Sequence, residues 1–261
     1  MPGSVTPVLE TGQLSVTYGG LRAVRDVSVT VRPGQVVGLI GPNGAGKTTF
    51  LDAVTGYVRS KGTVELKGRD VSAWRSHRRA RAGLARSWQS IELFDQLTAL
   101  DNLRVARDSV RRKMLTKDRL DDDGLVQILD LLGIADAAGQ LPGDLPNGKR
   151  KLLGVARALA SEPALLCMDE PAAGLDSSES VTLGSRLRSL VTQDMSILLI
   201  EHDMNLVFSV CDWVYVLVFG SVVAEGPPAE IRKNEQVIAA YIGRRAHQQH
   251  DSVPHQRGVE A

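Results

Sequence analysis

Hydrophobic and polar positions alternate early in the chain and later give way to short, wholly apolar runs. Residues 9–17 and 24–31 alternate, are rich in Val and Thr, and are followed by glycine or proline turns, so they are predicted to be half-buried strands. Three other runs, at residues 35–40, 164–168 and 196–200, are apolar without alternation, which is typical of strands buried on both faces. Helical patterns separate these runs, and this order predicts a parallel α/β sheet.

The middle of the chain has a different periodicity. Three stretches combine helical spacing of apolar residues with polar or charged residues on the remaining positions: residues 98–115, 120–132 and about 147–160. We therefore predict a helical subdomain at residues 91–160, inserted into an α/β core made of residues 8–90 and 161–243. Residues 244–261 are polar with few large apolar side chains, and we expect them to form a disordered tail.

A glycine-rich loop follows the first of the three buried runs. Its residues fit the pattern G-x-x-x-x-G-K-[ST]: Gly41, Pro42, Asn43, Gly44, Ala45, Gly46, Lys47 and Thr48, with Thr49 next. Glycines allow backbone N–H groups to approach a triphosphate, and the helix predicted at residues 48–55 adds the positive end of its dipole. We expect Lys47 to reach the β- and γ-phosphates and the Thr48 hydroxyl to hold Mg²⁺.

Polar residues follow the other two buried runs at the points where those strands should end. Asp169 and Glu170 follow the run at 164–168, and His202 lies just beyond the run at 196–200. In a parallel sheet the carboxyl ends of the strands line the ligand crevice, so these side chains should meet there. We expect Asp169 to be a Mg²⁺ partner, Glu170 to polarise an attacking water, and His202 to bond the γ-phosphate and orient that water.

Composition and charge narrow the class of protein. The 261 residues hold 31 Lys and Arg against 30 Asp and Glu, so the net charge of +1 gives no general attraction to nucleic acid. Two cysteines make no disulfide framework, and no apolar run approaches the length of about 18 residues needed to cross a bilayer. We therefore expect a cytoplasmic protein whose membrane role, if any, depends on a partner. The arginine-rich stretch at residues 75–86 is interpreted as a solvated helix face, and Cys167 as a small core residue.

The three elements, in this order, resemble the ATPase subunits of ATP-binding cassette (ABC) transporters over residues 8–243. The resemblance implies an α/β P-loop NTPase (RecA-like) core with an N-terminal antiparallel β subdomain and an inserted α-helical subdomain, with ATP and Mg²⁺ as cofactors. It also implies that Tyr18 stacks on adenine, and that Gln89 touches Mg²⁺ and marks the junction with the helical subdomain. Residues 172–176 match the loop that meets a second ATPase subunit, and His202 matches the family's switch histidine.

The signature segment of the family is altered in this chain. Residues 145–149 read Leu-Pro-Asn-Gly-Lys where Leu-Ser-Gly-Gly-Gln is usual. Pro146 has neither a hydroxyl nor an N–H for the γ-phosphate bound to the opposite subunit. Asn147, Gly148 and Lys149 are left as the expected contacts in trans. The composite site is therefore either weakened or partly restored by the positive charge of Lys149.

The text around Gln89, and the stretches at residues 93–103 and 237–243, are most similar to the ATPase subunits of branched-chain (hydrophobic) amino acid importers. Similar text occurs in urea importers and in the lipopolysaccharide-export ATPase, so these alternatives stay open. The implied partners are a second ATPase subunit, identical or not, and integral membrane permease subunits on the inner face of the cell membrane. No contact with nucleic acid or with the transported substrate is expected. A nucleotide-binding regulatory subunit with little turnover is a further alternative, whereas cassette proteins of translation or DNA repair need more than 261 residues.

Overall fold

The computed structural model describes residues 5–87, 92–110 and 120–241. The strands are β1 (Leu9–Tyr18), β2 (Leu21–Val27), β3 (Thr30–Val31), β4 (Val36–Ile40), β5 (Lys61–Leu66), β6 (Arg69–Asp70), β7 (Leu84–Ser87), β8 (Leu165–Asp169), β9 (Ser196–Ile200), β10 (Trp213–Val218) and β11 (Ser221–Gly226). The helices are α1 (Lys47–Thr55), α2 (Ser76–Arg81), α3 (Ala99–Val110), α4 (Asp122–Leu131), α5 (Asn147–Leu159), α6 (Ser177–Leu190), α7 (Met204–Val210) and α8 (Pro228–Ile231), with 3₁₀ turns η2 (Ala135–Ala137) and η3 (Pro142–Asp144).

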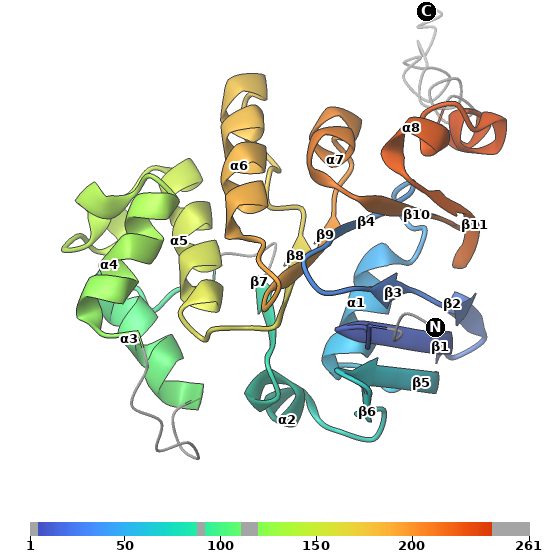
Figure 1. Ribbon diagram of the computed structural model, residues 1–261, viewed down its shortest axis with the longest axis horizontal. Coiled ribbons are helices and arrows are strands. Elements are labelled where there is room, and N and C mark those ends of the chain that lie inside the picture. Colours follow the sequence, from blue (N-terminus) through green and yellow to red (C-terminus); the bar gives the residue numbers. More distant parts are fainter. Residues whose placement is uncertain (1–4, 88–91, 111–119, 242–261) are drawn as a thin grey trace, which may run out of the picture.

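A central sheet holds the three buried runs that the apolar pattern predicted. Within the described residues its strand order is β11-β10-β4-β9-β8-β7, and only β11 runs antiparallel to its neighbour. Every residue of β4, β8 and β9 is buried, because helices cover one face and a second sheet with α1 covers the other (Figure 1). The predicted parallel α/β core is confirmed.

Side chains of the central strands alternate between two separate hydrophobic clusters. Val37 and Leu39 of β4 pack into the cluster that contains Phe50 of α1 and the inner face of the second sheet. Val36 and Ile40 of the same strand pack into the other cluster, with α6, α7 and the helical region. The two-residue period of a strand thus anchors the start of the glycine-rich loop from both sides.

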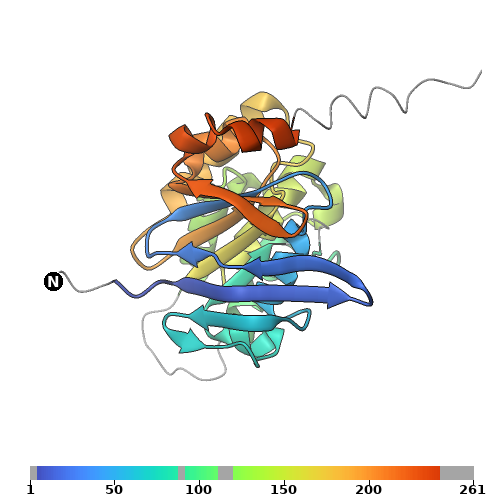
Figure 2. The ribbon, with the colours of Figure 1, turned by 90° about the vertical axis from the view of Figure 1, so that its right-hand side faces the viewer.

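The second sheet is antiparallel, with the order β2-β1-β5-β6 and with β3 paired to β1 (Figure 2). The single strand predicted at residues 24–31 is wrong, because the chain divides there into β2 and β3. Asp26 adopts a left-handed φ of 51°, and its N–H donates to the Ser15 hydroxyl at 2.8 Å, so the chain bends between the two strands. The two short strands pair with opposite ends of β1.

The predicted middle helices are present as α3, α4 and α5, which pack on one another at one end of the molecule (Figure 1). Their shared core includes the fully buried Leu103, Leu125 and Leu153. Asp121 caps α4 by accepting a bond from the Gly124 N–H at 2.9 Å, which explains an acidic cluster at a helix start. The boundaries of the inserted subdomain stay a prediction, and the tail at 244–261 lies outside the described residues.

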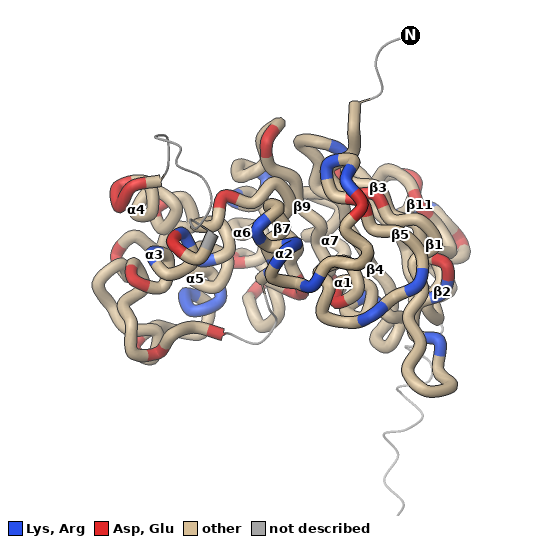
Figure 3. Tube along the Cα trace, turned by 90° about the horizontal axis from the view of Figure 1, so that it is seen from below, with Lys and Arg blue, Asp and Glu red and all other residues tan. Residues whose placement is uncertain are grey.

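The interpretation of residues 75–86 as a solvated face is wrong at two positions. Arg79 of α2 is 2% exposed and donates to the carbonyl oxygens of Ala53 and Val54 at the end of α1. The side chain of Arg86 of β7 is 5% exposed and forms ion pairs with Asp52 and Asp169. Figure 3 shows basic positions around α2 and β7. Arg79 of α2 and Arg86 of β7 connect these elements to α1 through hydrogen bonds.

No helix in the described part of the chain combines the length and the apolar composition needed to span a bilayer.

Candidate functional site

The glycine-rich loop connects the end of β4 to the start of α1, and its glycines are needed for different structural reasons. A Cβ on Gly41 would lie 2.0 Å from the carbonyl oxygen of Leu217, and a Cβ on Gly46 would lie 2.3 Å from that of Ala23. Both glycines also have positive φ angles, 153° and 101°. Gly44 has φ 77° with nothing within 4 Å of an added Cβ, so it faces open space. The loop is thus clamped at both ends and open at its tip.

Lys47 closes the loop on itself. Lys47 is only 6% exposed, and its Nζ donates to the carbonyl oxygens of Gly41 at 2.7 Å and Pro42 at 3.2 Å. Within the loop, the Ala45 N–H donates to the Pro42 carbonyl at 3.1 Å. A buried ammonium beside the N-terminus of α1 creates a concentrated positive region, which is the electrostatic requirement for a polyphosphate.

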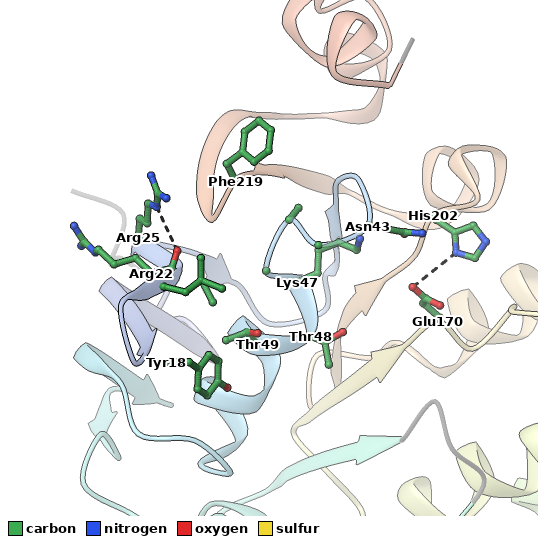
Figure 4. Close-up of a pocket in the computed structure, with 15 residues that line it drawn as sticks. Tyr18, Arg22, Arg25, Asn43, Lys47, Thr48, Thr49, Glu170, His202 and Phe219 are labelled. Carbon is green, nitrogen blue, oxygen red and sulfur yellow. Dashed lines mark hydrogen bonds and ion pairs between the residues drawn. The ribbon is translucent and has the colours of Figure 1, made fainter. Parts of the chain in front are cut away.

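An open pocket of about 680 Å³ lies over this loop. It brings together predicted residues that are far apart in sequence: Tyr18, Asn43, Gly44, Ala45, Gly46, Lys47, Thr48, Thr49, Glu170 and His202 (Figure 4). Tyr18 stands at one end of the pocket with its ring 48% exposed, while Glu170 and His202 stand at the other (Figure 4). The pocket therefore has an aromatic side chain at one end and the lysine, carboxylate and imidazole elsewhere along it, an arrangement suited to an aromatic base joined to phosphates.

Asp169 lies at the carboxyl end of β8 and is 2% exposed. Its Oδ2 accepts from Arg86 at 3.1 Å, whereas its buried Oδ1 has no hydrogen-bond partner among the described residues. Burial raises the pKa of this carboxyl, opposed by the charge of Arg86 and by hydrogen bonds from Arg86 and Thr48. A carboxylate with one unpartnered oxygen and with the Thr48 side chain near it fits Mg²⁺, which favours one or two protein oxygens completed by water and phosphate.

Glu170 and His202 face each other across the end of the sheet. The His202 Nδ1 lies 3.9 Å from the Glu170 Oε1, and Glu170 adopts a left-handed φ of 50°. Strained backbone in a non-glycine residue is concentrated at functional positions, and here it turns the carboxylate toward the pocket. A water held between these two groups would have a proton acceptor on one side and an imidazole on the other.

Glu201 was not predicted, although it supports both of these residues. It is fully buried; its Oε1 accepts from the Ala172 N–H at 2.8 Å and its Oε2 accepts from the His202 N–H at 3.1 Å. The carboxylate thereby joins the segment after Glu170 to the segment that carries His202. Its sequence neighbours gave a signal, because a strand-ending acid between an apolar run and a histidine is unusual in a core.

The turn between β10 and β11 also belongs to the site and has no local motif. The Gly220 N–H donates to the Ala45 carbonyl at 2.9 Å, and the Gly220 carbonyl accepts from the Arg25 N–H at 2.7 Å. Phe219, 73% exposed with φ 48°, stands over the same pocket, which Leu21 and Arg22 also line (Figure 4). These contacts join positions almost 200 residues apart, so no sequence spacing reports them.

The predicted residues of the signature segment are not among the described residues that line this pocket. Gln89 lies outside the described residues. Asn147, Gly148 and Lys149 form the first turn of α5, which begins after Pro146 at the N-cap position without a side-chain cap. Lys149 forms an ion pair with Asp136 of its own chain. A role in trans for these three residues stays a prediction.

Comparisons with known proteins give the same assignment. The family described as "ABC transporter" matches residues 24–173, and the family described as "Branched-chain amino acid ATP-binding cassette transporter" matches residues 221–247. The high-affinity branched-chain amino acid transport ATP-binding protein BraF of Pseudomonas aeruginosa is 36% identical over 253 residues, which cover 91% of this chain and 98% of BraF. LivG of Salmonella typhimurium, described in the same words, is 36% identical over 250 residues, with 91% and 98% coverage.

Among solved structures, the ADP conformation of an ATP-binding cassette of an ABC transporter superposes with a TM-score of 0.79 at 27% identity, covering 91% of this chain and 99% of that one. Identity and fold thus agree over nearly the whole chain. The chain therefore belongs to the ABC transporter family, as an ATP-binding subunit that hydrolyses ATP to drive transport.

Proposed function

We propose that this chain is the ATP-hydrolysing subunit of an ABC importer for branched-chain or other hydrophobic amino acids. The observation that carries the proposal is the pocket that brings the Lys47 loop together with Glu170 and His202, with Asp169 next to Glu170 at the end of β8. The relatives BraF and LivG, similar over more than nine tenths of the chain, support the amino acid substrate class. The alternatives of urea import and lipopolysaccharide export are not favoured by these similarities.

In this proposal ATP lies with its base on Tyr18 and its phosphates on residues 41–49. Thr48 and Asp169 would hold Mg²⁺, with Gln89 expected to join them, and the bound ion would supply positive charge to the phosphates. Glu170 accepts a proton from the attacking water, and His202 holds that water and the γ-phosphate in line. The ammonium of Lys47 exchanges its carbonyl partners for phosphate oxygens.

The assembly pairs two ATPase subunits head to tail. Residues 41–49 of one subunit and residues 145–149 of the other enclose each nucleotide, so that closure excludes water and hydrolysis reopens the pair. A groove of about 370 Å³ between α2 with β7 and α3 with α5 offers a docking place for a permease segment. The chain then lies on the inner face of the membrane through its permease subunits, without touching the transported substrate.

Two substitutions test the ATPase assignment. Glu170→Gln removes the proton acceptor but keeps the shape of the pocket, so ATP binding should stay within about twofold of wild type while turnover falls by at least about 10²-fold. Lys47→Ala should abolish ATP binding measured by calorimetry. Near-normal hydrolysis by Glu170→Gln would remove Glu170 from its role, and unchanged binding by Lys47→Ala would refute the phosphate site.

The amino acid assignment needs a transport measurement. The chain is reconstituted in vesicles with candidate permease subunits and a candidate binding protein, and uptake of radiolabelled leucine is compared with uptake of urea. ATP-dependent leucine uptake that disappears with Glu170→Gln supports the assignment. Urea uptake without leucine uptake would refute the substrate class and leave the ATPase assignment intact.

A second candidate is a nucleotide-binding regulatory half of a heterodimer with little turnover. It is favoured by Pro146 at the N-cap of α5, which offers no donor, and by the ion pair that holds Lys149 to Asp136. ATP turnover by the purified chain alone, compared with turnover after addition of a partner ATPase subunit, separates the two candidates. Robust hydrolysis by the chain alone would end the regulatory alternative.

A further inference from the structure

One guanidinium group connects two elements of the nucleotide site from behind. Arg86 lies on β7 with its side chain 5% exposed. Its Nη1 donates to the Asp52 Oδ1 at 2.5 Å, and its Nη2 donates to the Asp169 Oδ2 at 3.1 Å. Asp52 belongs to α1, the helix that begins at Lys47, and Asp169 ends β8. The planar group thus spans the helix below the phosphate loop and the strand that carries the acid.

This contact determines which oxygen of Asp169 is available. Oδ2 is occupied by Arg86, whereas Oδ1 is buried and without a hydrogen-bond partner among the residues described. A carboxylate fixed through one oxygen can rotate little, so the other oxygen is presented in a constant direction. We infer that Arg86 is a positioning residue, which orients the Asp169 carboxylate for the magnesium ion that accompanies ATP.

The geometry requires an arginine. A lysine presents its three donors from one nitrogen on a flexible stem, so it cannot hold two carboxylates in fixed directions as the planar guanidinium fork does. Arg79 provides a natural comparison, because it is also buried and also contacts α1, yet it donates to backbone carbonyl oxygens. The two arginines therefore separate an effect on Asp169 from a general effect on the packing of α1.

The inference deepens the proposed function and rests on it, so the test measures metal binding directly. Mn²⁺ is titrated into the full-length protein with a non-hydrolysable ATP analogue, and free Mn²⁺ is followed by electron paramagnetic resonance. Binding of the same analogue in EDTA is measured by calorimetry as a second readout. Arg86→Lys should weaken Mn²⁺ binding by about 10- to 100-fold, the usual effect of losing a group that orients a metal ligand, while analogue binding in EDTA changes less than about twofold.

Arg79→Lys is the matched control and should leave the Mn²⁺ affinity at the wild-type value. Mn²⁺ affinity within about twofold of wild type in Arg86→Lys, or an equal loss in Arg79→Lys, would overturn the inference. Asp52→Asn removes the charge that anchors Arg86 on α1, so the guanidinium is free to move from its position on Asp169. It should weaken Mn²⁺ binding in the same direction, and unchanged binding would contradict the inference even if Arg86→Lys failed to fold. Wild-type protein that takes up no Mn²⁺ with the analogue would instead refute the proposed function.

Discussion

Replacing Glu201 is the sharpest test of how the two sides of the site are held together. The carboxylate is fully buried and accepts from the Ala172 N–H at 2.8 Å and the His202 N–H at 3.1 Å. Glu201→Gln keeps the size of the side chain and one acceptor. The new amide nitrogen then faces one of the two backbone donors, so one of these bonds is lost. We expect the loop that carries His202 to shift, because its N–H has the longer bond.

The size of the effect follows from these two bonds. A hydrogen bond to a charged group contributes about 1.5–3 kcal/mol, so losing one costs about that amount. Burial raises the pKa of Glu201, which means that the protein resists the charged form and that a neutral amide relieves part of this cost. The net loss of unfolding free energy should be below about 2 kcal/mol, small beside the 5–15 kcal/mol typical of a domain. A displacement of His202 by about 1 Å should lower turnover by about 10²-fold.

The assay compares three quantities in wild type and Glu201→Gln: unfolding free energy in urea, ATP affinity, and steady-state ATP turnover. ATP affinity should hold, because Glu201 is buried and is not among the described residues that line the pocket over the Lys47 loop. Asp121→Ala is the control, since loss of the α4 cap costs about 1 kcal/mol far from the pocket and should leave turnover unchanged. Turnover within twofold of wild type in Glu201→Gln, or an equal loss in Asp121→Ala, would refute the reasoning.

Three further results are expected. Gly46→Ala should lower ATP affinity by at least about tenfold, because the added Cβ would collide with a backbone carbonyl oxygen. An added Cβ at Gly44 meets no atom, so Gly44→Ala should bind ATP more tightly than Gly46→Ala. Equal ATP affinities of the two variants, measured by calorimetry, would contradict this. Tyr18→Ala should weaken ATP binding by about 1–3 kcal/mol, because the base loses its stacking partner, whereas Tyr18→Phe keeps the ring and should bind ATP as the wild type does. Unchanged ATP affinity in Tyr18→Ala would show that the ring does not stack on the base. Cys167 and Cys211 should resist thiol labelling at pH 8 in the folded protein and both react in guanidinium, since burial raises the pKa of the Cys167 thiol to about 12 and that of Cys211 further; rapid labelling of the native state would argue against these positions.

The local sequence pattern was enough to predict the buried strands of the central sheet and the glycine-rich loop. The apolar runs in β4, β8 and β9 do not alternate with polar residues, because both faces of the sheet are covered. Each of these strands can therefore be recognised from its own sequence. The glycine-rich loop was equally visible, since its glycines, lysine and threonine must be adjacent. Strand ends placed Asp169, Glu170 and His202 at one edge of the sheet. Their roles in hydrolysis remain predictions until the substitutions above are measured.

Charge was the poorest guide. Arg86 and Arg79 were interpreted as solvated because arginine is usually exposed, yet tertiary packing supplied carboxylates to one and carbonyls to the other. No recognisable spacing in the sequence links Arg86 to Asp169 or Arg79 to the carbonyl oxygens at the end of α1. Phe219 and Gly220 escaped for the same reason, because a hairpin turn in the last fifth of the chain closes over a loop in the first. The signature segment shows the opposite case, where a local motif is visible but its partner belongs to another subunit.

The strand that leads into the phosphate loop has a consequence for biosynthesis. β4 ends at residue 40, yet both strands that flank it, β9 and β10, begin only at residues 196 and 213. During translation the ribosome must therefore add more than half of the polypeptide before this loop gains its sheet neighbours. A nascent chain arrested before β10 should be unable to retain ATP, and one released beyond Gly220 should acquire that ability, so nucleotide capture would mark the completion of folding.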